Sequence, residues 1–183
     1  MTKHSICVYC GARPGNDPIY METAAEMGQA IAAEQWRLVY GAGDVGLMGG
    51  VARAAQSAGA ETFGVIPQHL LDWEVGKRDL TRFVVTETMH ERKKVMVMNS
   101  DAIVVLPGGA GTLDEFFEVL TWRQLGLHNK PIVLINVGGY WDPLRALLAN
   151  VIDTGFAAED TASYIQCMPD VPSAVTFLRR ALS

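Results

Sequence analysis

Several features are scarce in this sequence, and each scarcity excludes a class of protein. The 183 residues include only three cysteines, too few for the disulfide framework of a small secreted domain. No apolar run approaches the about 20 residues of a membrane-spanning helix, and the N-terminus lacks the basic flank and apolar stretch of a secretory signal. The 15 basic residues are outnumbered by 20 acidic ones, and the net charge of -5 does not suit the binding of nucleic-acid phosphates. We therefore expect a cytoplasmic protein that binds neither membranes nor nucleic acid.

Short apolar runs alternate with helical patterns along the whole chain. Strands are predicted at residues 5–9, 37–40, 61–66, 82–86, 101–106 and 131–136, with a weaker candidate at 164–167. Helices are predicted at residues 17–34, 46–58, 88–99, 112–127, 142–153 and 172–182. The strand candidates at 103–106 and 132–135 are apolar without alternation, as in strands covered on both faces. The pattern predicts one α/β domain over residues 1–183, a Rossmann-like, doubly wound parallel sheet flanked by helices.

Helix ends carry recognisable signals. Asp17 and Asp142 each precede a proline, which predicts an N-cap followed by proline in the first helical position. Gly59 and Gly155 are placed to end their helices.

The first candidate site is the G-x-G-x-x-G run at residues 41–46. A dinucleotide site of this kind also needs an acidic residue at the end of the next strand. The next strand ends Ile66-Pro67-Gln68, and its acid, Glu61, lies at the opposite end. This argues against NAD or FAD. A tight turn near a phosphate or ribose and a simple packing role both remain open.

The second candidate site is the run PGGAGTLDE at residues 107–115. A buried strand leads into three glycines and then into a helix, an arrangement whose backbone N–H groups suit a phosphate. No Walker sequence occurs in the chain. Thr112 and Glu115 also match a capping box, so Glu115 could serve only as a helix cap.

The third candidate site is the run TMHERKK at residues 88–94. Thr88 and Glu91 again match a capping box, whereas Arg92, Lys93 and Lys94 oppose the helix dipole. That basic cluster indicates either a nearby anionic ligand or a solvated basic surface. Residues 95–98 are apolar on every side of the helix, which indicates a subunit interface or a larger core.

Residues 40–50 (YGAGDVGLMGG), 89–93 (MHERK) and 107–115 (PGGAGTLDE), with 7–11 (CVYCG), resemble the LOG ("Lonely Guy") family. The family comprises cytokinin riboside 5′-monophosphate phosphoribohydrolases, often mislabelled lysine decarboxylases. The resemblance implies a Rossmann-like homodimer that hydrolyses the N-glycosidic bond of a nucleoside 5′-monophosphate, releasing free base and ribose 5-phosphate. No metal or redox cofactor is implied, and Cys7-x-x-Cys10 lacks the second pair that a zinc site needs.

The resemblance also implies roles for individual residues. Arg92 and Glu115 would be the catalytic pair. Substrate contacts would come from the motifs at 89–93 and 107–115, from the helix that follows, and from the long irregular stretch at residues 67–79. These residues are Glu74, Met89, Lys93, Gly108, Gly109, Ala110, Gly111, Thr112, Leu113, Asp114 and Thr121, to which we add Gly43 and Asp44. The chain departs from the common family pattern at Ala42, Asp44 and Ala110, and we expect Ala110 to enlarge the pocket and affect base preference.

The implied chemistry agrees with these residue types. Departure of the base leaves positive charge on the ribose C1′, which an ionised Glu115 can stabilise. Arg92 stays protonated at any working pH, so a positional and electrostatic role is expected for it. The alternative is a carrier that binds a nucleotide or cofactor without turnover, with Glu115 acting only as a cap. A dinucleotide-dependent reductase is a weaker alternative, and a decarboxylase would require a lysine able to hold pyridoxal phosphate.

Overall fold

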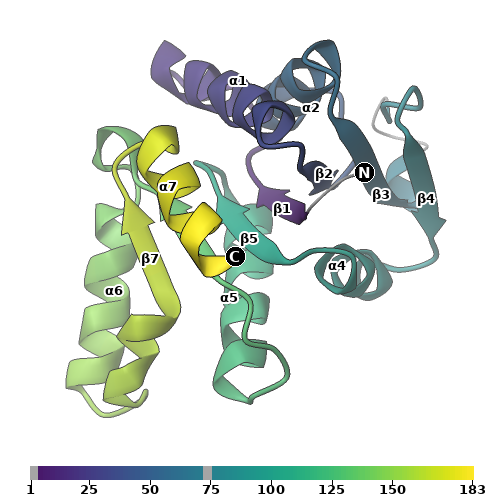
Figure 1. Cartoon of the computed structure of the whole chain (residues 1–183). Helices are drawn as coiled ribbons and strands as arrows, with labels where there is room; N and C mark the ends of the chain where they lie inside the picture. The colour runs from purple at the N-terminus through teal and green to yellow at the C-terminus, as the bar shows by residue number, and fades with distance from the viewer. Residues whose placement is uncertain (1–3, 72–75) are drawn as a thin grey trace.

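The structure, a computed structural model, describes residues 4–71 and 76–183, and within these ranges seven parallel strands form one sheet in the order β4-β3-β2-β1-β5-β6-β7 (Figure 1). The strands are β1 (Ser5–Tyr9), β2 (Arg37–Tyr40), β3 (Glu61–Pro67), β4 (Arg82–Thr86), β5 (Ala102–Val105), β6 (Ile132–Ile135) and β7 (Ile165–Met168). The α/β fold and its parallel sheet are therefore confirmed.

Helices cover both faces of the sheet. The helical segments are α1 (Pro18–Ala33), α2 (Gly46–Ser57), α3 (Gln68–Leu71), α4 (Met89–Met98), α5 (Ala110–Gln124), η1 (Val137–Gly139), α6 (Asp142–Asp153), η2 (Glu159–Tyr164) and α7 (Val171–Ala181). One buried apolar cluster joins α1, α2 and α7 to one face, and a second joins α4, α5 and α6 to the other. Alternate residues of β1 serve the two clusters: Ile6 and Val8 belong to the first, Cys7 and Tyr9 to the second.

The chain reverses its direction across the sheet between β1 and β5. It first adds β2, β3 and β4 outward from β1, then returns to place β5 on the opposite side of β1, with Tyr9 level with Val105. In open parallel sheets, ligands bind outside the carboxyl ends of the strands at such a switch point. The loops that follow β1 and β5 therefore frame the expected site.

Most predicted boundaries agree with the structure to within one residue, but α5 differs at both ends and the predicted N-cap of α6 is wrong. Gly59 and Gly155 end their helices with positive φ values of 88° and 80°, and Asp17 caps α1 by accepting a hydrogen bond from the Ile19 N–H at 3.0 Å. Asp142, however, is the first residue of α6 rather than its N-cap, because its carboxylate accepts a hydrogen bond from the Asn136 amide instead. Helix α5 runs from Ala110 to Gln124, whereas residues 112–127 are predicted, so it begins two positions earlier and ends three positions earlier.

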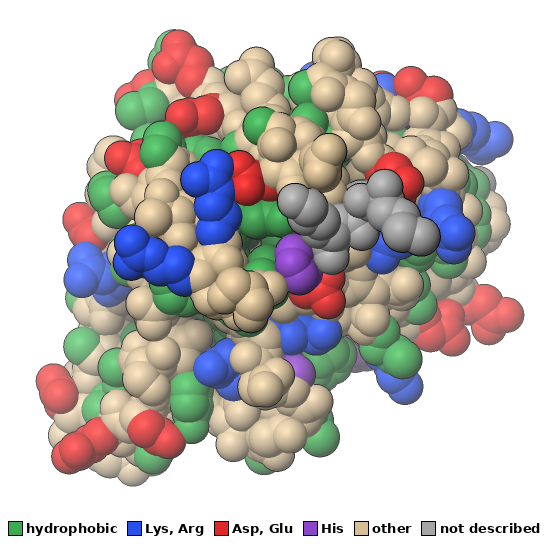
Figure 2. Space-filling view, viewed as in Figure 1, with side chains coloured by type: hydrophobic (Ala, Val, Ile, Leu, Met, Phe, Trp, Pro, Cys, Tyr) green, Lys and Arg blue, Asp and Glu red, His purple; other side chains and the backbone are tan. Residues whose placement is uncertain are grey.

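Three features of the described residues concern membranes, nucleic acid and metal ions. None of the helices in residues 4–71 and 76–183 combines the length and hydrophobicity that crossing a bilayer requires. On the face shown in Figure 2, basic side chains are dispersed among acidic and uncharged ones. Within the same ranges, no group of three or more His, Cys, Asp or Glu residues is placed to hold a metal ion.

Candidate functional site

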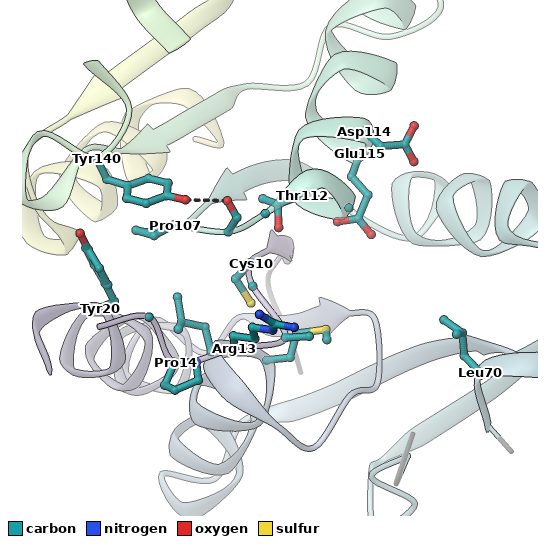
Figure 3. Close-up of a pocket in the computed structure, with 18 of the residues that line it drawn as sticks. Cys10, Arg13, Pro14, Tyr20, Leu70, Pro107, Thr112, Asp114, Glu115 and Tyr140 are labelled. Atoms are coloured by element: carbon teal, nitrogen blue, oxygen red, sulfur yellow. Dashed lines mark hydrogen bonds between the residues drawn. The ribbon is translucent and has the colours of Figure 1, made fainter. Parts of the chain in front are cut away.

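A cavity of about 530 Å³ opens at the switch point between β1 and β5. Its walls come mainly from the loops after these two strands and from the N-terminal parts of α2, α4 and α5, with single residues from α1, α3 and the turn after β6. Figure 3 shows most of the residues that surround it. The lining residues are Cys10, Gly11, Ala12, Arg13, Pro14, Gly15, Asn16, Tyr20, Leu47, Met48, Leu70, Met89, Arg92, Pro107, Gly108, Gly109, Gly111, Thr112, Asp114, Glu115 and Tyr140.

The glycine-rich loop after β5 is held close to the loop after β1. The Gly11 N–H donates to the Pro107 carbonyl at 3.0 Å, and a Cβ on Gly108 would lie only 2.1 Å from Thr112 Oγ1. A side chain at position 108 would therefore force the loop away from α5. Helix α5 then begins with Gly109 as its N-cap, and no side chain caps it.

The uncapped start of α5 has two consequences. Its first N–H groups have no partner within the helix and can bind an anion. The alternative that Glu115 is a cap is wrong, because the helix begins before Thr112 and both residues lie inside it. At α4, by contrast, the predicted capping box is confirmed: Glu91 N–H donates to Thr88 Oγ1, and Thr88 N–H donates to Glu91 Oε2, both at 3.2 Å.

The carboxyl group of Glu115 is directed into the cavity, whereas that of Asp114 is directed away (Figure 3). Burial raises the pKa of Glu115 to about 7, although the positive charges of Arg92 and Lys93 oppose the rise. The neighbouring carboxylates of Asp114 and Glu118 contribute to it. A carboxyl group with this pKa changes its charge near neutral pH, as suits a group that acts on a substrate.

Arg92 is buried at the start of α4, lines the cavity and forms hydrogen bonds to the backbone of β3 and of the turn after β2. Its Nε donates to the Val65 carbonyl at 3.1 Å and its Nη2 to the Gly41 carbonyl at 2.8 Å. The remaining nitrogen, Nη1, lies 3.8 Å from Met89 Sδ beside the cavity. Two backbone carbonyls thus fix the guanidinium, which places a permanent positive charge near Glu115.

The predicted basic cluster of α4 divides into three environments. Arg92 lines the cavity, and Lys94 is exposed. Lys93 is buried between α4 and α5, where its Nζ lies 2.9 Å from Asp114 Oδ2 and 3.1 Å from Glu118 Oε1. Burial lowers the pKa of Lys93, but the hydrogen bonds to these two carboxylates outweigh it and hold the pKa above its usual value.

Eight of the predicted site residues line the cavity, namely Met89, Arg92, Gly108, Gly109, Gly111, Thr112, Asp114 and Glu115. Other predicted residues lie elsewhere among the described residues, namely Lys93, Ala110, Leu113, Thr121, Gly43 and Asp44. Glu74 lies outside the described residues.

Local contacts explain these other positions. Asp44 pairs with Arg53 at 2.8 Å, and Thr121 Oγ1 donates to the Phe117 carbonyl of its own helix at 2.7 Å. Ala110 is exposed on the first turn of α5. Ala110 therefore does not line the cavity, and its effect on base preference stays a prediction.

Sequence reasoning missed one side of the cavity. The loop at residues 10–16 supplies the exposed Arg13, and Tyr20 and Tyr140 meet edge to face with ring centroids 5.5 Å apart. The Tyr140 hydroxyl donates to the Gly108 carbonyl at 2.7 Å (Figure 3). The motif at residues 7–11 indicated the start of the loop at residues 10–16, but no sequence signal indicated Tyr140.

Comparisons with known proteins find related sequences over most of the chain. The family described as "Possible lysine decarboxylase" matches residues 48–178. A cytokinin riboside 5′-monophosphate phosphoribohydrolase of Rhodococcoides fascians is 44% identical over 179 residues, covering 97% of this chain and 90% of the relative. The enzyme of the same name from Mycobacterium tuberculosis is 44% identical over 171 residues, covering 93% and 91%. That of Oryza sativa subsp. japonica is 42% identical over 164 residues, covering 90% and 68%.

Solved structures share the fold at lower identity. The molybdenum cofactor carrier protein of Chlamydomonas reinhardtii is 23% identical, with a TM-score of 0.75 and 98% of each chain covered. The molybdenum cofactor binding protein of Rippkaea orientalis is also 23% identical, with a TM-score of 0.78 and 100% and 99% covered. At this identity the likeness concerns the fold alone.

Proposed function

This chain belongs to the LOG family, which is also described as "Possible lysine decarboxylase". We propose that it is a nucleoside 5′-monophosphate phosphoribohydrolase, the activity for which its relatives are named. Its substrates are adenosine 5′-monophosphates with or without an N6 substituent, and its products are the free base and ribose 5-phosphate. The observation that carries the proposal is Glu115, a carboxyl group free of any capping role that faces the cavity from the helix whose N-terminus is uncapped.

The 5′-phosphate binds at the start of α5. The N–H groups of the first turn and the helix dipole favour an anion there, and Arg13 adds a positive charge on the opposite loop. Glu115 lies about 6–8 Å further along the helix axis, at about 1.5 Å per residue. A ribose whose phosphate occupies the N-terminus therefore extends toward the Glu115 carboxylate.

Hydrolysis breaks the bond between C1′ and the base nitrogen. As the base leaves with the bonding electron pair, positive charge develops on the ribose, and the ionised Glu115 stabilises it. Water then adds to C1′, and its proton is passed on to the departing base. Arg92 fixes the strand ends beside the ribose and lowers the pKa of Glu115, which keeps more of that carboxyl ionised.

The residues present do not fit pyridoxal phosphate, the cofactor that an amino-acid decarboxylase requires. A Schiff base forms on a neutral lysine amine. In the described part of the chain the cavity wall includes no lysine, and Lys93 is held protonated between Asp114 and Glu118.

The active form is a cytoplasmic homodimer. Met98 at the end of α4 is 70% exposed, and Leu125 and Leu127 after α5 are each 68% exposed. Lys93 joins these two helices side by side, so a second copy can cover both. Free Cys7, Cys10 and Cys167 suit a reducing compartment. A dimeric mass by light scattering at micromolar concentration supports the proposal, whereas a monomeric mass contradicts it.

The catalytic role is tested with Glu115→Gln. The variant should bind AMP in calorimetry about as tightly as the wild type while releasing no detectable adenine. Glu87→Gln, an exposed carboxylate outside the cavity wall, is the control and should keep full activity. Equal turnover by Glu115→Gln contradicts the assigned role, and binding without turnover by the wild type favours a carrier.

A further inference from the structure

One contact at the cavity joins residues far apart in the sequence. The Tyr140 hydroxyl, at the end of the turn after β6, donates to the carbonyl of Gly108 in the glycine-rich loop. The distance is 2.7 Å, typical of a well-formed O–H···O hydrogen bond. Tyr140 itself is half-buried and lines the cavity.

This bond sets the orientation of a particular peptide plane. In a trans peptide the C=O and N–H groups point in opposite directions, so holding the Gly108 carbonyl fixes the direction of the Gly109 N–H. The neighbouring carbonyls are also occupied, since Pro107 accepts from the Gly11 N–H and Gly109 accepts from the Leu113 N–H. Without the tyrosine hydroxyl, glycine on both sides of the Gly108–Gly109 peptide leaves it free to rotate.

Tyr140 is itself held in a rigid setting. Its ring meets Tyr20 and Trp141 edge to face, with centroids 5.5 and 4.8 Å apart. The turn that presents it is fixed by Asn136, whose Oδ1 accepts from the Trp141 N–H at 2.6 Å and whose backbone N–H donates to the Met168 carbonyl at 2.8 Å. The hydroxyl can therefore hold the loop in one orientation rather than follow it.

We infer that Tyr140 is a positioning residue for phosphate binding: its hydroxyl holds the Gly108–Gly109 peptide so that the Gly109 N–H meets the phosphate of the substrate. The inference rests on the proposed function, because it concerns the phosphate of that substrate. Tyr140 acts through the loop and takes no part in the chemical step. Its loss affects recognition of the phosphate and leaves recognition of the base unchanged.

The test is Tyr140→Phe, which removes the hydroxyl and keeps the ring contacts. We expect the KM for AMP and the inhibition constant of inorganic phosphate each to rise about three- to tenfold, the range that one ordinary hydrogen bond supplies. The kcat and the inhibition constant of adenine should be unchanged. Tyr164→Phe is the matched control, since it removes a hydroxyl that bonds to Asp160 at 2.6 Å outside this cavity.

A direct reading comes from the amide resonance of Gly109 in ¹H–¹⁵N spectra during titration with inorganic phosphate. The resonance should move in the wild type and in Tyr164→Phe, and move much less in Tyr140→Phe at equal saturation. An unchanged phosphate constant, or an equal loss of adenine and phosphate affinity, overturns the inference while the proposed function stands. A wild type that neither binds phosphate nor cleaves AMP refutes the proposed function, and the inference with it.

Discussion

Replacing Glu115 with glutamine should stabilise the protein above neutral pH while it removes the activity. The Glu115 carboxyl has an ordinary pKa of 4.5, and burial in the fold raises the pKa to about 7. Between these values the folded state binds a proton that the unfolded state releases, so the free energy of unfolding falls as pH rises. Above pH 7 the buried Glu115 is ionised, and its charge lowers the free energy of unfolding by the full amount. Below about pH 4.5 the carboxyl group is protonated in both states, and this loss of stability is absent.

The magnitude follows from the two pKa values. Each pKa unit corresponds to about 1.4 kcal/mol, so the interval from 4.5 to about 7 corresponds to about 3 kcal/mol. Glutamine has a similar size and no charge. At pH 8, Glu115→Gln should therefore raise the free energy of unfolding by up to about 3 kcal/mol, or the melting temperature by about 6–12 °C for a chain of this size. At pH 4.5 the two proteins should melt within about 2 °C of one another.

The assay is urea or thermal unfolding of both proteins at pH 4.5, 6, 7 and 8. Other titrating groups cancel in the difference between the two proteins, and Glu87→Gln controls for loss of one exposed carboxylate. A variant that is less stable than the wild type at pH 8 would refute the reasoning. So would a stability difference that is the same at every pH, because it would show that burial does not raise the pKa of Glu115.

Two further predictions concern the charges around Glu115. Because the ionised carboxyl group of Glu115 is the active form, kcat/KM for AMP should rise with pH through about 7 and then level off. Asp114→Asn removes a negative charge that raises the pKa of Glu115, so the rise in kcat/KM should move to lower pH. A pH profile that stays in place or moves to higher pH contradicts the assignment. Gly41→Ala places a Cβ 2.0 Å from Arg92 Nη2, so the guanidinium must leave the Gly41 carbonyl. We expect kcat/KM to fall by roughly 10²-fold while circular dichroism shows an intact fold. A fully active variant would show that this placement of Arg92 is unimportant for activity.

The sheet could be predicted because its signals are local. The strands at 5–9, 37–40 and 82–86 have the predicted bounds. Buried parallel strands read as short apolar runs, and glycine or an Asp-Pro pair marks several helix ends. The predicted N-cap role of Asp142 is wrong although α6 spans residues 142–153 as predicted, because the Asp142 carboxylate accepts a hydrogen bond from the nearby Asn136 amide.

The site could be predicted only in part, because its geometry depends on contacts between distant segments. The same Thr-x-x-Glu pattern is a cap at Thr88 and lies inside a helix at Thr112, since α5 already begins after Gly109. The sequence also did not indicate that the Lys93 side chain pairs with Asp114 and does not line the cavity. The Tyr140 contact spans 32 positions and has no local signature.

Product analysis with the purified wild-type protein tests the central claim most directly. The protein is incubated separately with AMP and with N6-isopentenyladenosine 5′-monophosphate, and free base, nucleoside and ribose 5-phosphate are separated by chromatography. We predict equal amounts of free base and ribose 5-phosphate from at least one substrate, with no nucleoside formed. Intact nucleotide in both reactions, despite measurable binding, would contradict hydrolysis and leave a protein that only carries its ligand.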